Sequence, residues 1–295
     1  MNGYTLGEFI YESRKKLGIT QEELAFGICS PGTLSKIENG LAVPKRRNYE
    51  ALMQRLGKPQ GSCEVCLTHS DIELHAAMRK ITKSIAVNDV QEAGRLLEEL
   101  QQTAGIEPLI VQFILYMKAI VHGKQKEKPE QVLEELFLAL GMTMRDTKNY
   151  TAQRRRYTFD EVIILNNIAI QYQRQGELKK ALRVLVWLKE YLEERNADDE
   201  TKERVYPLIL HNTAHFLYGK EIFREALELY DTGITFCMHC GRYHLLPYLL
   251  HGKSVCHNAL GAPEEADTSE RQAGELFALL AGRCEPPDAP ISITL

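Results

Sequence analysis

The sequence lacks a long apolar segment. Its 295 residues are 44% hydrophobic and 26% charged, but they contain no run of about 18 apolar residues. The first residues, MNGYTLGEFIYESRKK, do not hold the apolar core of a signal peptide. These absences argue against a membrane partner and predict a cytoplasmic protein. Seven cysteines, an odd number, in such a chain favour reduced thiols over a disulfide framework.

Motifs of several enzyme classes are also missing. The sequence has no glycine-rich phosphate loop, no GxSxG elbow and no paired catalytic carboxylates on facing elements. His211 and His215 stand four residues apart, but no flanking glutamate completes the HExxH pattern of a metalloprotease. We therefore expect a protein that is not an enzyme and that uses neither a cofactor nor a bound metal.

A strong positive charge is absent as well. The net charge is -4, which argues against a protein that coats nucleic acid with its whole surface. Residues 1–57 carry eight Lys and Arg against six acidic residues, whereas the rest carries 28 against 34. The N-terminal part is therefore about +2 and the remainder about -6, which permits contact with DNA at one end only.

The periodicity of the sequence is helical. Alternating β-branched runs are missing, and apolar residues recur three and four positions apart along nearly the whole chain, which predicts an all-α fold. A glycine- and proline-containing break at 57–62 marks a domain boundary, and the end EPPDAPISITL has no periodicity. The predicted parts are a DNA-binding domain (1–57), a linker (58–66), a helical repeat domain (67–282) and a flexible tail (283–295).

The N-terminal part is predicted to hold five short helices, two of which have clear starting signals. Thr20 and Glu23 form a capping box. The next helix begins with Ser30 as its N-cap and Pro31 at its first position, and it ends at Asn39-Gly40. A short helix, a tight turn and a second capped helix make a helix-turn-helix.

Residues 6–57 resemble the phage-repressor or XRE-type helix-turn-helix, through Leu17, the segments 20–25 and 34–40, and Pro44. In that family the second helix of the motif lies in the major groove with its first residues near base edges. The resemblance implies that Lys36 and Thr33 are exposed readers and that Gln21 contacts a phosphate. A domain of this kind that has lost DNA binding is the alternative. The candidate DNA-binding residues are Gln21, Ser30, Gly32, Thr33, Ser35, Lys36, Lys45 and Arg46.

An internal repeat fills most of the remaining chain. LNNIAIQYQRQGELKKAL from Leu165, LHNTAHFLYGKEIFREAL from Leu210 and LHGKSVCHNALGAPEEAD from Leu250 align with small residues and alanines in register. The spacing exceeds the roughly 34 residues of a standard tetratricopeptide repeat, so the helices or loops are extended. With two weaker upstream copies, the pattern predicts about five tetratricopeptide-like helix pairs stacked as an α-solenoid.

The first helix of each pair lines the concave face of such a solenoid, and the positions that face inward in this repeat family carry amides and imidazoles here. Asparagine donates and accepts at once, which suits the backbone of an extended peptide. Asn167 and Asn212 occupy the same repeat position. The alternative is that these side chains are solvated or pair with neighbouring helices. The candidate peptide-binding residues are Asn166, Asn167, Gln173, Arg174, His211, Asn212, His215, Tyr218, His251 and Asn258.

The two parts together resemble the peptide-pheromone receptors of Gram-positive bacteria, the Rgg-like and PlcR-like regulators of the RNPP group. The resemblance implies quorum sensing by a homodimer that binds a roughly palindromic operator in double-stranded DNA and a short imported peptide in its concave groove. Arg154, Arg155 and Arg156 are candidates for holding a peptide carboxylate, or they form a solvated loop.

Two other functions remain open from the sequence. One is a regulator of the same type whose repeat domain binds a protein instead of a short peptide. The other is a metal or redox sensor that uses the CxxC pairs Cys63–Cys66 and Cys237–Cys240, the second with His244, Cys256 and His257 nearby. Buried, inert thiols are the preferred interpretation of these cysteines.

Overall fold

The computed structural model describes residues 5–59, 69–103, 105–125, 127–152, 155–194, 197–279 and 291. All helices and turns in this part of the chain agree with the predicted all-α class. The predicted linker and tail fall almost entirely outside the described residues, as do Cys63, Cys66 and Arg154. The predicted domain boundaries therefore stay predictions.

Within residues 5–59 the N-terminal domain has four helices, where five were predicted: α1 (Leu6–Lys16), α2 (Gln21–Ala25), α3 (Pro31–Glu38) and α4 (Arg46–Leu56). The stretch between α3 and α4 is not helical. Pro44 disfavours the helical conformation in the residue before it, so α4 starts only after the proline. The predicted starts of α2 and α3 are confirmed, because Thr20 and Glu23 form a capping box and the Ser30 side chain accepts a hydrogen bond from the Thr33 N–H.

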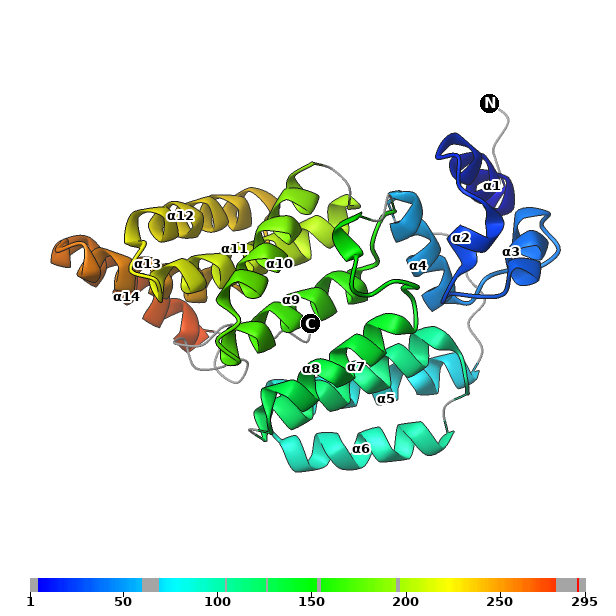
Figure 1. Ribbon diagram of the computed structural model, residues 1–295, viewed down its shortest axis with the longest axis horizontal. Coiled ribbons are helices and arrows are strands. Elements are labelled where there is room, and N and C mark those ends of the chain that lie inside the picture. The colour runs from blue at the N-terminus through cyan, green and yellow to red at the C-terminus, as the bar shows by residue number, and fades with distance from the viewer. Residues whose placement is uncertain are drawn as a thin grey trace.

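Between residues 69 and 279, the described part of the chain has ten further helices in five consecutive pairs, which confirms the predicted number of repeats. The pairs are α5 (His69–Ala86) with α6 (Val90–Thr103), α7 (Pro108–Lys124) with α8 (Pro129–Gly141), α9 (Phe159–Arg174) with α10 (Leu178–Glu193), α11 (Asp199–Tyr218) with α12 (Phe223–Cys240), and α13 (Leu246–Ala259) with α14 (Pro263–Leu279). A 3-10 turn (Tyr150–Ala152) lies between the second and third pairs. Figure 1 shows these pairs as a curved stack with the N-terminal domain beside the start of α9.

Small residues set the distance between helices within the stack. The repeated alanines Ala181, Ala226 and Ala266 are fully buried, as their recurrence predicted. Gly252 on α13 brings the helices still closer, because a Cβ there would lie 2.2 Å from the ring of Tyr230 on α12. Close packing of this kind leaves no room for an added methyl group without a shift of the helices.

Two apolar cores are present. One runs through the repeat domain from α5 to α14, and the other fills the N-terminal domain. Leu109 of α7 belongs to the N-terminal core, so the repeat domain inserts a side chain into its neighbour. Within the described residues, no helix has the length and apolarity that a membrane span requires.

Gly252→Ala should lower the free energy of unfolding by about 1–3 kcal/mol, because the added methyl group collides with the buried Tyr230 ring. Gly94→Ala in α6 is the matched control, since a Cβ there meets nothing within 4 Å. That control should raise the stability by about 0.5–1 kcal/mol. Urea unfolding would measure the stability of both variants. Equal stabilities of Gly252→Ala and Gly94→Ala would show that α12 and α13 have room for an added methyl group at residue 252.

Candidate functional site

A buried carboxylate holds the helix-turn-helix together. Glu38 at the end of α3 accepts two hydrogen bonds from Arg14 of α1, at 2.7 and 2.8 Å, and one from Gln21 of α2, at 2.7 Å. Burial raises the pKa of Glu38, but hydrogen bonds from Arg14 and Gln21 outweigh burial and hold the pKa below its ordinary value. The three helices are thereby fixed relative to one another by one ionised group.

The N-terminal end of α3 is exposed. Ser30, Gly32, Thr33 and Lys36 are all exposed, whereas Ser35 is half-buried. The Ser30 hydroxyl accepts from the Thr33 N–H at 3.0 Å, which fixes the first turn. The predicted readers Thr33 and Lys36 are therefore both accessible on α3, Thr33 in its first turn and Lys36 in its last.

Gln21, the predicted phosphate contact, lies at the start of α2. Its Nε2 donates to Glu38 at 2.7 Å, so the side chain is held against α3. A side-chain amide has two N–H donors, and the second is available to an acceptor such as a phosphate.

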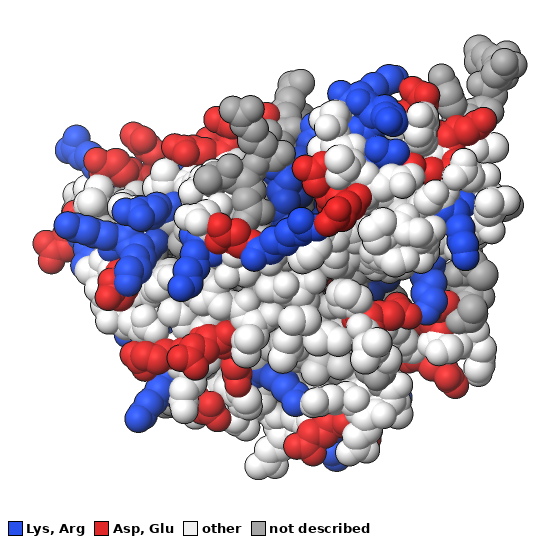
Figure 2. Space-filling model, turned by 45° about the vertical axis from the view of Figure 1, so that its right-hand side comes forward, with Lys and Arg blue, Asp and Glu red and all other residues white. Residues whose placement is uncertain are grey.

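Lys45 and Arg46 have carboxylate partners away from α3. Lys45 Nζ lies 2.6 Å from Glu107 at the start of α7, and Arg46 pairs with Glu50 at 2.7 Å. Both cations line a cleft of about 820 Å³ between α4 and the repeat domain. These two predicted DNA-binding residues are thus exposed and paired with carboxylates at this cleft. Figure 2 shows Lys and Arg interspersed with Asp and Glu on this side of the molecule, so the surface charge alone does not mark a DNA-binding face.

The N-terminal domain docks on the repeat domain through Arg55 of α4. Its guanidinium donates to the carbonyl oxygens of Leu24, at 3.1 Å, and Phe26 on its own domain. It also donates to the carbonyl oxygen of Thr143, at 2.9 Å, and to the carboxylate of Glu161, at 3.3 Å. One side chain, 3% exposed, therefore joins α2, the loop after α8, and α9.

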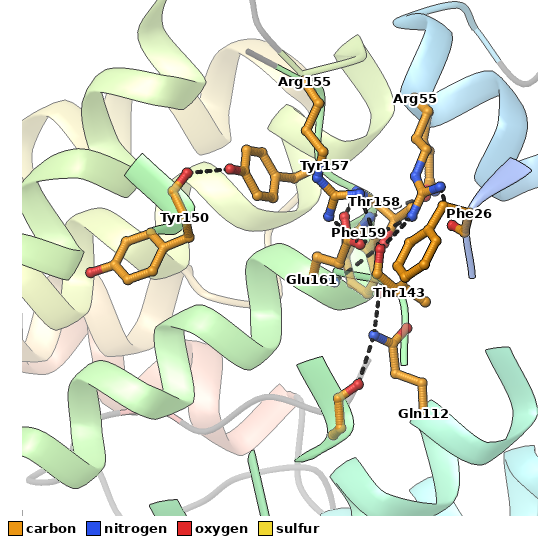
Figure 3. Close-up of polar contacts among 12 residues, drawn as sticks. Phe26, Arg55, Gln112, Thr143, Tyr150, Arg155, Tyr157, Thr158, Phe159 and Glu161 are labelled. Carbon is orange, nitrogen blue, oxygen red and sulfur yellow. Dashed lines mark hydrogen bonds and ion pairs between the residues drawn. The ribbon is translucent and has the colours of Figure 1, made fainter. Parts of the chain in front are cut away.

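Glu161 is the counter-ion at this contact (Figure 3). Its side chain is fully buried, lies 2.6 Å from the Arg155 guanidinium and accepts from the Thr158 N–H at 2.8 Å. Burial raises the pKa of Glu161, but the charges of Arg155 and Arg55 outweigh burial and keep the pKa below its ordinary value. We therefore expect Glu161 to be ionised near neutral pH, between two arginines.

Further contacts join the end of α4 to the start of α9. The side chain of Gln54 accepts from the Phe159 N–H at 3.0 Å, and Arg156 donates to the carbonyl oxygen of Leu56 at 2.5 Å. Gly27, with φ +69°, approaches so closely that a Cβ would lie 2.5 Å from the Thr143 Cα. These contacts correct the suggestion that Arg155 and Arg156 hold a peptide carboxylate, because the loop before α9 faces α4.

A second cleft, of about 860 Å³, lies on another side of the docking contact. Leu17 and Phe26 line it from the N-terminal domain, and Trp187 and Tyr191 line it from α10. Trp187 stacks on Tyr191 with ring centroids 5.4 Å apart, and Tyr157 meets the tryptophan edge-on at 5.2 Å.

Two of the predicted peptide-binding residues come together on neighbouring first helices of the stack. Asn212 of α11 donates to Asn166 of α9 at 2.9 Å. The same two side chains contact the main chain of Ile291. Both asparagines are at most 1% exposed. This pair is the best candidate for reading a peptide backbone.

Asn167 and Asn212, which were aligned in the sequence, both donate to the first helix of the preceding pair. Asn167 of α9 donates to the Tyr116 hydroxyl of α7 at 3.2 Å, as Asn212 of α11 donates to Asn166 of α9. A shift of one residue turns a side chain by about 100° around a helix. Asn166, one position before Asn167, therefore faces α11 instead of α7.

The other predicted groove residues are dispersed. His211 is buried among rings, 5.8 Å from Tyr230 and 6.3 Å from Tyr248. His251 lies 2.8 Å from Glu270 of α14, so both histidines contact neighbouring helices, as the alternative reading expected. The remaining residues are half-buried or exposed: Gln173, Arg174, His215, Tyr218 and Asn258.

The described cysteines do not form a metal site. Within the described ranges, no group of three or more His, Cys, Asp or Glu side chains could hold a metal ion. Cys237 is buried, and burial raises the pKa of its thiol to about 12. A thiol in this state is a poor metal ligand and a poor nucleophile.

Several functional residues could not be found from the sequence. Thr158 and Glu161 form a capping box, a local signal that places the start of α9 but does not reveal the partner Arg55. Ile291 has no sequence signal, because the end of the chain lacks periodicity.

The exposed helix α3 and the stacked helix pairs define a helix-turn-helix protein with an appended helical repeat domain. A family model described as helix-turn-helix matches residues 10–59, and the RNPP family C-terminal domain matches residues 78–284. The second match covers more than half of the chain, which therefore belongs to the RNPP family. It is a helix-turn-helix transcriptional regulator of that family, and the family is not enzymatic.

Solved structures share the fold along nearly the whole chain. PlcR from Bacillus thuringiensis in complex with the peptide PapR7 and DNA matches with a TM-score of 0.63 and 20% identity, over 95% of this chain and 96% of that chain. The apo form of that protein matches with a TM-score of 0.57 and 19% identity, over 93% of this chain and 94% of that chain. ComR from S. thermophilus in complex with DNA and its signalling peptide ComS matches with a TM-score of 0.51 and 16% identity, over 94% of each chain. A search of curated protein sequences found no match.

Acid should weaken the docked arrangement through Glu161. Its pKa is lower when folded than the ordinary 4.5, so its contribution to stability is fully present above that value and is lost as the pH falls through the lower, folded-state pKa. Glu161→Gln should reduce the free energy of unfolding at pH 7 by about 3–5 kcal/mol, because Arg55 then stays buried without a counter-ion.

Urea unfolding followed by circular dichroism from pH 7 to pH 3 would measure both effects. The Glu161→Gln variant should show a smaller loss of stability in acid than the wild type. Glu98→Gln, on the exposed side of α6, is the control and should behave as the wild type. If Glu161→Gln lost as much stability between pH 7 and pH 3 as the wild type, the Glu161 carboxylate would not be ionised in the folded protein.

Proposed function

We propose that this protein binds double-stranded operator DNA as a homodimer in the cytoplasm and that a short linear peptide in its concave groove controls the binding. The observation that carries the proposal is the Asn166–Asn212 pair, which places two buried amides where they contact a main-chain N–H and C=O. The exposed end of α3 supports the DNA part. The crystallised complexes of PlcR and ComR, which contain DNA and peptides, support it by likeness of fold.

Helix α9 offers a physical route between the two functions. It carries Asn166 in the groove and Glu161 at the docking contact, five residues apart on one helix. A peptide that binds more tightly to one of two placements of helix α9 therefore also changes the contact between Glu161 and Arg55. Coupling requires only this difference in affinity between two arrangements of the domains.

Lys36→Ala should weaken binding to the operator and should reduce the slope of log affinity against log salt by about 1, because one phosphate-neutralising charge is lost. Fluorescence anisotropy with the DNA upstream of the gene for this protein, at several salt concentrations, would measure both quantities. Lys179→Ala on α10 is the matched control for loss of an exposed lysine.

Saturable binding well above that of scrambled DNA supports the proposal, and a pool of synthetic peptides can then be screened for changes in DNA affinity. Equal, weak binding of the wild type and of Lys36→Ala to both DNAs, in the presence and absence of the peptide pool, would contradict the DNA-binding part.

A further inference from the structure

The buried pair Asn166 and Asn212 already has a main-chain partner. The Ile291 N–H donates to Asn212 Oδ1 at 2.8 Å, and the Ile291 carbonyl oxygen accepts from Asn212 Nδ2 at 3.1 Å. Asn166 Nδ2 reaches the same carbonyl oxygen at 3.4 Å. Asn212 thus pairs with both polar groups of one residue, as a neighbouring β-strand would.

The sequence did not predict this position of Ile291. The end of the chain has no helical periodicity and was predicted to be loose. Ile291 is nevertheless only 4% exposed and belongs to the apolar core of the repeat domain. Its main chain and its side chain are therefore both held by the repeat domain.

We propose that Ile291 is a tethered occupant of the peptide groove, which an incoming peptide must displace. This inference rests on the proposed function, in which the groove binds a peptide. Asn212 has a single side-chain carbonyl and a single amide nitrogen, and Ile291 uses both. An external peptide cannot make the same paired contact while Ile291 is in place.

The contacts also define the chemical class of the ligand. The asparagines read the main chain, so the ligand is an extended peptide, and the buried position of Ile291 suits a branched aliphatic side chain. A residue that is tethered to its site by the chain competes at an effective concentration on the order of 1 mM. The protein then responds only to a peptide that is abundant or that binds better than its own residue.

A fluorescein-labelled synthetic peptide with the sequence APISITL, which spans residues 289–295, is the probe. Anisotropy would measure its affinity for the full-length wild type and for full-length Ile291→Pro. Proline lacks the N–H that Asn212 accepts, so the variant should leave the groove accessible. We expect the variant to bind the probe at least tenfold more tightly than the wild type.

Two controls identify the site of binding. In the Ile291→Pro chain, Asn212→Ala should weaken probe binding at least tenfold, whereas Gln131→Ala, which removes an exposed amide on α8, should not change it. A probe that carries an N-methyl group on its isoleucine nitrogen should lose binding, because the donor to Asn212 is blocked. Thermal unfolding checks that each variant is folded.

Equal affinity of wild type and Ile291→Pro for the probe, or no binding to either at 1 mM, would overturn the inference. So would a result in which Asn212→Ala leaves the affinity unchanged. The proposed function is tested separately by the DNA titration and the peptide pool. A pool peptide that binds both full-length proteins equally and changes DNA affinity would overturn the tethered occupant while supporting peptide control.

Discussion

The arrangement of the whole molecule depends on one buried carboxylate, Glu161. A charge without solvent is unfavourable unless it is paired and hydrogen-bonded. The carboxylate of Glu161 is paired from both domains at once, by Arg55 and by Arg155. It also accepts a hydrogen bond from the N–H of Thr158, the N-cap of α9. The same carboxylate therefore caps the helix that carries Asn166. Exposed ion pairs around it, such as Lys45 with Glu107, add at most about 1 kcal/mol each, so the orientation of the N-terminal domain rests on the buried group.

Local signals were sufficient for the helices and for the class of fold. Capping residues such as Thr20 and Ser30 act within one turn, so their effect can be read from neighbouring letters. The repeated alanines are likewise a direct record of close helix packing. The docking of the domains was not predictable in this way. Arg55 and Glu161 are 106 residues apart, and the type of each residue does not predict which distant residue it pairs with.

The repeat alignment paired Asn167 with Asn212, and each contacts the first helix of the preceding pair, α7 and α9 respectively. The alignment could not predict that Asn166 would be the partner of Asn212, because it compares equivalent positions and not the neighbours that each side chain meets. The buried position of Ile291 was not predicted. Periodicity reports on regular helices, and it is silent about a single residue that binds through its main chain.

The chain has a single tryptophan, and its location gives the protein a built-in optical probe. Trp187 lines the cleft that Leu17 and Phe26 close from the N-terminal domain, with Tyr157 packed edge-on against its ring. Movement of the N-terminal domain away from the repeat domain changes the solvent around this indole and around no other. The emission wavelength of the unlabelled protein therefore reports the separation of the two domains, and a rapid-mixing instrument can follow that separation in time.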